Sequence, residues 1–180
     1  GGTNVGVVRV KNERGCALYL IDSGGSEKDA RKIETILNAH FTDWQLQAVI
    51  NTHSHADHTG GNAYFAEKTK CEIWMPYLEK GSVENTLLQP SIAWGGFPLP
   101  ELRTPYYVPA YAEPTRVIHA EECIEFSDGK KLRFIALPGH YFEMLGVMCK
   151  NPDGRCAFFA GDAVFGKKFI AKFSIPFMFD

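Results

Sequence analysis

The chain has 180 residues, of which 45% are hydrophobic and 22% are charged, and its formal net charge is -2. This length fits one domain with a substantial buried core, and the composition excludes a chain that is disordered throughout. The lysines and arginines are scattered, so the charge pattern predicts neither nucleic acid nor an anionic membrane as a partner.

No apolar run is long enough to span a bilayer, and the N-terminal residues show neither a basic segment nor an apolar signal core. The cysteines are odd in number and dispersed, and four of them lie in apolar runs typical of strands, which favours buried thiols in a reducing compartment. They are Cys16, Cys71, Cys123, Cys149 and Cys156. We therefore expect a soluble, cytoplasmic protein, either monomeric or a homo-oligomer.

The first elements follow directly from the pattern of apolar residues. Two β-prone runs, 5–10 and 16–22, flank a polar turn and predict an antiparallel hairpin. Ser26 precedes a segment whose apolar residues recur at helical spacing, which predicts an N-cap followed by a helix. The short apolar run 48–50 then predicts a buried strand that leads into a polar, histidine-rich segment.

A helix over 63–70 and a strand over 72–75 complete a predicted strand, helix, strand unit. From residue 82 to residue 117 the pattern changes, because six prolines alternate with tryptophan, phenylalanine and tyrosine without a helical or strand period. Such a long irregular stretch indicates a lid, a binding loop or a contact surface, and a surface insertion packed by its own aromatic residues is the alternative.

The second half of the chain predicts four strands joined by turns. They cover 121–126, 132–136, 145–149 and 156–160, with glycine-containing turns inside each of the two hairpins. No repeat of solenoid length and no low-complexity tract interrupts them. The order of elements predicts an α/β fold in which sheets are flanked by helices.

The histidine-rich segment predicts a metal site. In an extended chain His53 and His55 project to the same side, and Asp57 and His58 follow where the chain turns into the next helix. A single histidine is usually an ordinary surface or core residue, but three histidines and an aspartate within six positions rarely arise from composition alone. Imidazole and carboxylate together suit zinc, with iron or manganese as alternatives.

Two later positions occur in the same context, each after a predicted strand and a glycine. They are His140, which follows Gly139, and Asp162, which follows Gly161. Taken alone, His140 can be a turn residue and Asp162 a helix cap. Ligands that follow several strands meet at one edge of a sheet, so these residues are candidates for the same metal site.

These motifs together resemble the metallo-β-lactamase superfamily. Residues 52–62 are similar to its His-X-His-X-Asp-His segment followed by Gly-Gly, residues 137–140 to its next histidine motif, and residues 159–162 to its aspartate motif. Residues 20–24 are similar to the aspartate-containing turn that ends the early hairpin of the family. The resemblance implies one domain over 3–180 with an αββα sandwich fold, incomplete at the C-terminus.

The resemblance also implies a division of the ligands between two metal ions. Three histidines would hold the first ion, an aspartate and a histidine the second, and a further aspartate would bridge them. In that order these residues are His53, His55 and His140, then Asp57 and His58, then Asp162. The last second-site histidine of the family would lie beyond Asp180, and residues 175–180 look like the interior of a longer protein. We therefore expect an incomplete second site in this chain.

The other histidines and the residues after His140 are expected to have structural or supporting roles. His40 and His119 are expected to be structural, the former near a helix end and the latter at the start of a strand. Tyr141 and Phe142 are expected in the core or the wall of a pocket. Glu143 is a candidate hydrogen-bond partner for a ligand.

The expected activity is hydrolysis by water that a bound metal activates. Asp57 or Asp162 would accept or orient the proton of that water, and the substrate would be a small ester, thioester, lactone or lactam. The irregular aromatic stretch suits a small organic molecule. Two alternatives remain: a sulfur-compound dioxygenase with one iron, and a metal-binding protein that is catalytically incomplete.

Overall fold

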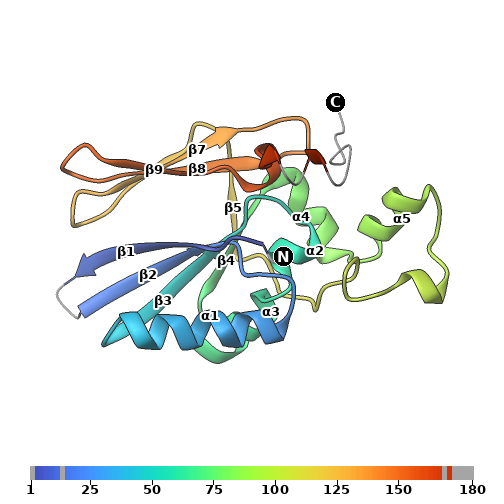
Figure 1. Cartoon of the computed structure of the whole chain (residues 1–180), viewed down its shortest axis with the longest axis horizontal. Coiled ribbons are helices and arrows are strands. Elements are labelled where there is room, and N and C mark those ends of the chain that lie inside the picture. The colour runs from blue at the N-terminus through green and yellow to red at the C-terminus, as the bar shows by residue number, and fades with distance from the viewer. Residues whose placement is uncertain (1–2, 13–14, 168–169, 172–180) are drawn as a thin grey trace.

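The computed structural model describes residues 3–12, 15–167 and 170–171. Within them the chain forms two β-sheets that face each other, and Figure 1 shows helices below the first sheet and at one end of the pair. The expectation stated above for residues 175–180 falls outside the described residues. No helix among the described residues is long and apolar enough to cross a membrane.

The first sheet is mixed and contains the predicted hairpin at one edge. Its strands lie in the order β1 (Gly6–Asn12), β2 (Gly15–Ile21), β3 (Trp44–Ile50), β4 (Glu72–Pro76) and β5 (Arg116–Ile118). The first pair is antiparallel and the other three pairs are parallel. Parallel neighbours require crossover connections, and these connections contain five helices.

The helices lie between strands of the first sheet. They are α1 (Glu27–His40), α2 (Ala56–Thr59), α3 (Asn62–Thr69), α4 (Tyr77–Glu84) and α5 (Leu88–Trp94). The Ser26 side chain accepts a hydrogen bond from the Asp29 amide, so the predicted N-cap is confirmed. Ala30 and Leu37 on α1 are buried against the sheet together with Phe65 on α3.

The second sheet is an antiparallel meander of the four predicted strands. These are β6 (Cys123–Glu125), β7 (Lys131–Ala136), β8 (Leu145–Lys150) and β9 (Cys156–Phe159). β6 begins later than expected because Glu121 has a φ of 67°. This left-handed conformation cannot continue an extended strand.

The core between the two sheets comes from the inward residues of both. Ile50 and Trp74 of the first sheet pack in one cluster with Phe134 and Val147 of the second. Side chains alternate between the faces of a strand, and on β7 the buried residues Leu132 and Phe134 alternate with exposed neighbours. This packing fixes the relative position of the two sheets and of the loops at their ends.

The stretch 82–117 contains more regular structure than the sequence predicts. It holds the end of α4, all of α5, a 3-10 turn at Pro100–Leu102 and most of β5, whereas 103–115 has neither helix nor strand. Pro90 lies in the first turn of α5, where an amide has no helical partner to lose. Pro90 is therefore compatible with this helix, which ends at Gly95 in the left-handed conformation.

The cysteines also differ from the expectation. Cys71 and Cys149 are buried and Cys16 is partly buried, but Cys123 and Cys156 are exposed. The prediction of buried thiols is wrong for these two because they lie on the edge strands β6 and β9, at positions that face away from the core.

Candidate metal centre

The predicted ligands meet at one end of the two sheets. The loop after β3 carries two of the histidines, α2 a third, the loop between β7 and β8 a fourth, and the turn after β9 an aspartate. In that order they are His53 and His55, His58, His140 and Asp162. The prediction that strand ends bring these side chains together is therefore confirmed for all five.

Two glycines allow the loops to come this close. Gly139 has a φ of 123°, which a residue with a side chain rarely adopts, and it turns the chain directly before His140. A Cβ on Gly161 would lie 2.8 Å from Oγ1 of Thr52, so only glycine lets the turn that carries Asp162 reach the loop of His53.

Three imidazole nitrogens form the first group. Nε2 of His53 and Nε2 of His140 each lie 3.0 Å from Nδ1 of His55. In a tetrahedral zinc site with Zn–N distances of about 2.0–2.1 Å, neighbouring nitrogens are about 3.3 Å apart. The spacing of these three nitrogens therefore suits one tetrahedral ion with a fourth position open.

The protonation of this group also suits a metal. Burial and the neighbouring histidines lower the pKa of His53 well below its usual value and lower the pKa of His55 to about 3. Both rings are therefore neutral at physiological pH. A metal binds neutral imidazole, so no proton has to leave these two residues first.

A second group shares His53 with the first and adds His58 and Asp162. Oδ1 of Asp162 lies 3.3 Å from Nε2 of His58, and its Oδ2 lies 3.5 Å from Nε2 of His140. Burial raises the pKa of Asp162, but the adjacent histidines outweigh it and lower the pKa overall. An ionised carboxylate thus lies between the two groups, one oxygen towards each.

Asp57 lies at the outer edge of this arrangement. Its Oδ2 is 3.6 Å from Nε2 of His58 and accepts a hydrogen bond of 2.9 Å from Oγ1 of Thr3. Its side chain is 42% exposed, and it belongs to neither three-residue group found among the described residues. It is therefore near the second group but more accessible to water than the histidines.

Asp22 is a member of the site that the sequence analysis left without a role. It follows β2 directly and accepts hydrogen bonds from the Thr52 amide (2.8 Å) and hydroxyl. Its Oδ2 also lies 2.8 Å from Nδ1 of His58, which orients that ring. Burial lowers the pKa of His58, but the carboxylates of Asp22 and Asp162 raise it to about 11.

Two further assignments can be compared with the structure. The Tyr141 ring is buried with its centre 4.2 Å from that of His55, as expected for a wall residue, whereas Phe142 is 50% exposed. The prediction for Glu143 is wrong, since its carboxylate accepts a hydrogen bond from the Leu78 amide (2.6 Å) at the start of α4. The Glu143 carboxylate therefore binds the start of α4 and not a metal-binding side chain.

His40 and His119 lie outside both groups, as expected. His40 is the last residue of α1. His119 follows β5 and does not start a strand, and the centre of its ring is 5.7 Å from that of Tyr77.

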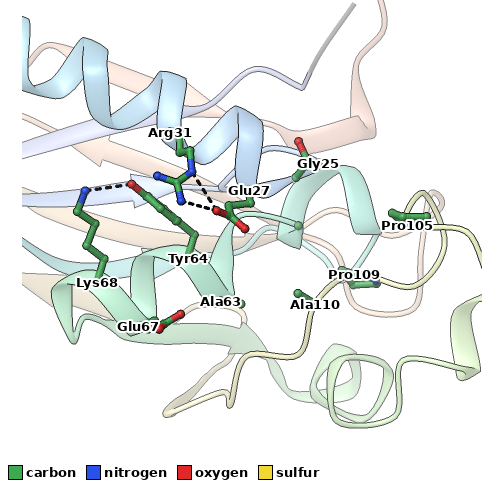
Figure 2. A pocket seen from close by; sticks show the side chains of 12 residues that line it. Gly25, Glu27, Arg31, Ala63, Tyr64, Glu67, Lys68, Pro105, Pro109 and Ala110 are labelled. Carbon is green, nitrogen blue, oxygen red and sulfur yellow. Dashed lines mark hydrogen bonds and ion pairs between the residues drawn. The ribbon is translucent and has the colours of Figure 1, made fainter.

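A separate open pocket of about 700 Å³ lies between α1, α3 and residues 105–110 (Figure 2). Three of its charged side chains have partners within it, because Glu27 pairs with Arg31 (2.6 Å) and the Lys68 ammonium lies 3.1 Å from the Tyr64 hydroxyl. None of the clustered histidines lines it. The metal groups and this pocket are therefore distinct features.

Comparison with known proteins agrees with the fold and the motifs. The metallo-beta-lactamase superfamily model matches residues 1–173. A hydroxyacylglutathione hydrolase of Pseudomonas aeruginosa is 40% identical over 76 residues, which are 42% of this chain and 27% of that protein. A hydroxyacylglutathione hydrolase of Polaromonas sp. is 24% identical over 132 residues, 73% of this chain and 39% of that protein.

Solved structures share the fold at low sequence identity. A metallo-beta-lactamase of Cronobacter sakazakii has a TM-score of 0.69 and 18% identity over 93% of this chain and 60% of that chain. A subclass B3 metallo-beta-lactamase of Bradyrhizobium japonicum has a TM-score of 0.65 and 23% identity over 87% of this chain and 54% of that chain. The predicted αββα metallo-β-lactamase fold is therefore confirmed. The chain spans less than two thirds of the length of each of these relatives.

Proposed function

Since this chain belongs to the metallo-beta-lactamase superfamily, we propose that it is a metal-dependent hydrolase whose centre is built from the two facing groups. His53, His55 and His140 would hold the first ion, and His58 with Asp57 would hold the second. Asp162 would lie between both ions. Zinc is the first choice of metal because the donors are imidazole nitrogens and carboxylate oxygens, a set that iron and manganese also accept.

The observation that carries this proposal is the convergence of three imidazoles from two distant loops. The nitrogens of His53 and His140 each lie 3.0 Å from that of His55, although 85 residues separate His55 from His140. Three imidazole nitrogens that face one point are a donor set that zinc binds in proteins. A bound divalent cation satisfies all three together.

The reaction class follows from the groups around the centre. When bound, the metal lowers the pKa of a coordinated water to about 7 and polarises a carbonyl oxygen of the substrate. Asp57 is half-exposed and adjacent to His58, so its carboxylate can accept a proton from water at the mouth of the site. Asp162 is ionised and fixed between His58 and His140, which suits orienting that water.

The substrate part of the proposal is a small ester, thioester, lactone or lactam, with neither nucleic acid nor membrane as a partner. Two kinds of relative support it: hydroxyacylglutathione hydrolases in sequence and beta-lactamases in fold. A hydroxyacylglutathione is a thioester and a β-lactam is a cyclic amide. Both compounds are hydrolysed at a carbonyl carbon, so the proposed substrate carries a hydrolysable acyl group.

Metal content and hydrolysis measured together test the proposal. The chain is purified without chelator, analysed for zinc, iron and manganese, and assayed with an ester, a thioester, a lactone and a cephalosporin. We expect near-stoichiometric metal and hydrolysis of at least one substrate. Chelation should lower that rate by about 100-fold or more, since metal activation is worth several kcal/mol, and added zinc should restore it.

Substitutions identify the ligands. His53→Ala and His140→Ala should each remove the first ion, while His119→Ala, outside both groups, should leave metal content unchanged. Folded protein that binds none of the three metals would refute the proposal. Iron as the sole metal, without any hydrolysis, would instead favour the dioxygenase alternative.

A further inference from the structure

Glu79 is a buried carboxylate that takes no part in the proposed reaction. It lies in the first turns of α4 and its exposed fraction is 0%. Carboxylates are rarely fully buried unless specific partners surround them, because leaving water is costly for a charged group. The identity of its partners therefore indicates what this residue does.

Glu79 accepts three hydrogen bonds from two separate loops. Its Oε2 accepts from the amide (3.1 Å) and the hydroxyl (2.6 Å) of Ser54, and its Oε1 accepts from the amide of Glu143 (2.9 Å). Burial raises the pKa of Glu79, and these three donors oppose that effect. Each oxygen of the carboxylate thus serves a different loop.

Both loops carry proposed ligands of the first metal group. Ser54 lies between His53 and His55, and Glu143 follows His140 by three residues. The loops are far apart in sequence, and Glu79 is a common hydrogen-bond partner of both. Glu79 thus connects the loop of His55 to the loop of His140, and the ring nitrogens of these two histidines lie 3.0 Å apart.

We propose that Glu79 is a positioning residue that sets the distance between the two loops and thereby preorganises the first metal group. The proposal rests on the metal-binding function proposed above. In this proposal α4 supplies the side chain that connects the two loops. A carboxylate is required because two backbone amides and one hydroxyl donate hydrogen bonds to it. Glutamine has one acceptor oxygen, and its NH₂ group would face an amide N–H of one of the loops.

A purely structural role of Glu79 and a positioning role predict different effects on stability and on metal affinity. If Glu79 only anchored α4, its replacement would lower the stability of the chain and leave the folded metal site unchanged. If it positions the loops, the metal-free protein stays folded while the histidines lose their fixed spacing. Metal affinity and metal geometry then change more than stability does.

Glu79→Gln tests this difference, with Glu84→Gln as a matched control on the same helix. Glu84 is exposed and pairs with Lys80 (3.2 Å). Metal-free wild type and both variants are titrated with Co²⁺ and with Zn²⁺, and thermal unfolding is recorded without metal. For Glu79→Gln we expect first-ion affinity to fall about 10- to 100-fold, the range for residues that orient ligands. The visible spectrum of bound Co²⁺ should change as well, and the Glu84→Gln values should equal wild type.

Ser54→Ala provides a second variant if Glu79→Gln does not fold. It removes the 2.6 Å hydroxyl contact and keeps both amide contacts, so a smaller loss of several-fold in Co²⁺ affinity is expected with the same direction of spectral change. First-ion affinity and Co²⁺ spectrum equal to wild type in the folded variants would overturn the role of Glu79. Wild type that binds neither ion would refute the proposed function itself, and the proposal about Glu79 with it.

Discussion

Oδ2 of Asp22 lies 2.8 Å from Nδ1 of His58, and the two side chains are only 3% and 2% exposed. This pairing divides the centre into two halves that differ in protonation. Burial lowers the pKa of His58, but Asp22 and Asp162 raise it to about 11, whereas the pKa of His55 falls to about 3. Without a metal ion His58 carries a proton at neutral pH and His55 does not.

The second ion should therefore compete with a proton, whereas the first should not. Binding at His58 releases one proton, so second-site affinity is expected to rise about tenfold per pH unit between pH 6 and pH 8. Affinity at the His53 and His55 group should vary much less over this range. Calorimetric titration with zinc at three pH values, in buffers of different ionisation enthalpy, counts the protons. Equal pH dependence of the two zinc affinities would contradict the assignment of a protonated His58 to the second site.

The stability of the metal-free chain should fall in acid. The folded-state pKa of His55, about 3, is below the value of about 6.5 for an unfolded chain, so the unfolded state binds more protons. The free energy of unfolding is therefore expected to decrease as pH falls from about 6.5 towards 3, by about 1.4 kcal/mol per pH unit from this residue. Urea unfolding of chelator-treated protein at several pH values measures it. His55→Gln should reduce the slope, and an unchanged slope would count against the pKa assignment.

The first metal group could be predicted from sequence for a physical reason. The strand patterns at 48–50 and 132–136 are strong, and each is followed within four residues by a histidine of the first group, as 156–160 is followed by Asp162 of the second. The strands 132–136 and 156–160 run in the same direction in the second sheet, so the segments that follow them lie at one end of it. That the segment after 48–50 in the other sheet reaches the same end was expected from the resemblance of the motifs to the family.

Asp22 and Glu79 could not be assigned in this way. Their roles depend on which backbone and ring nitrogens face them after packing, and neither lies in a cluster of ligand-type residues along the chain. The helix α5 within 82–117 was missed because a proline and a tryptophan obscure a helical period over only seven residues.

The contact between α2 and the turn after β2 should depend on Gly60. A Cβ on this residue would lie 2.3 Å from the carbonyl carbon of Gly25, and since this is backbone the two segments would have to separate. Gly60→Ala is expected to lower the free energy of unfolding by about 1–3 kcal/mol and to weaken the site at Asp57 and His58. Urea unfolding and zinc titration measure the two effects.

Gly81→Ala is the matched comparison, because a Cβ on Gly81 in α4 would meet nothing within 4 Å. It should raise the free energy of unfolding by about 0.5–1 kcal/mol through helix propensity and leave zinc binding unchanged. A stability loss of equal size in both alanine variants would show that the close approach at Gly60 is unimportant.

Asp162→Asn should affect both ions, because each oxygen of Asp162 faces a histidine of a different group, at 3.3 Å and 3.5 Å. Asparagine keeps the size of the side chain and removes its charge. Both affinities are therefore expected to fall, the second more strongly because fewer protein nitrogens remain there, and ester or thioester hydrolysis should fall with them. Asp153→Asn serves as the control, since Asp153 lies in an exposed turn and pairs only with Arg155. Zinc titration and hydrolysis are measured on both variants, and loss of only one ion in Asp162→Asn would show that Asp162 does not bridge.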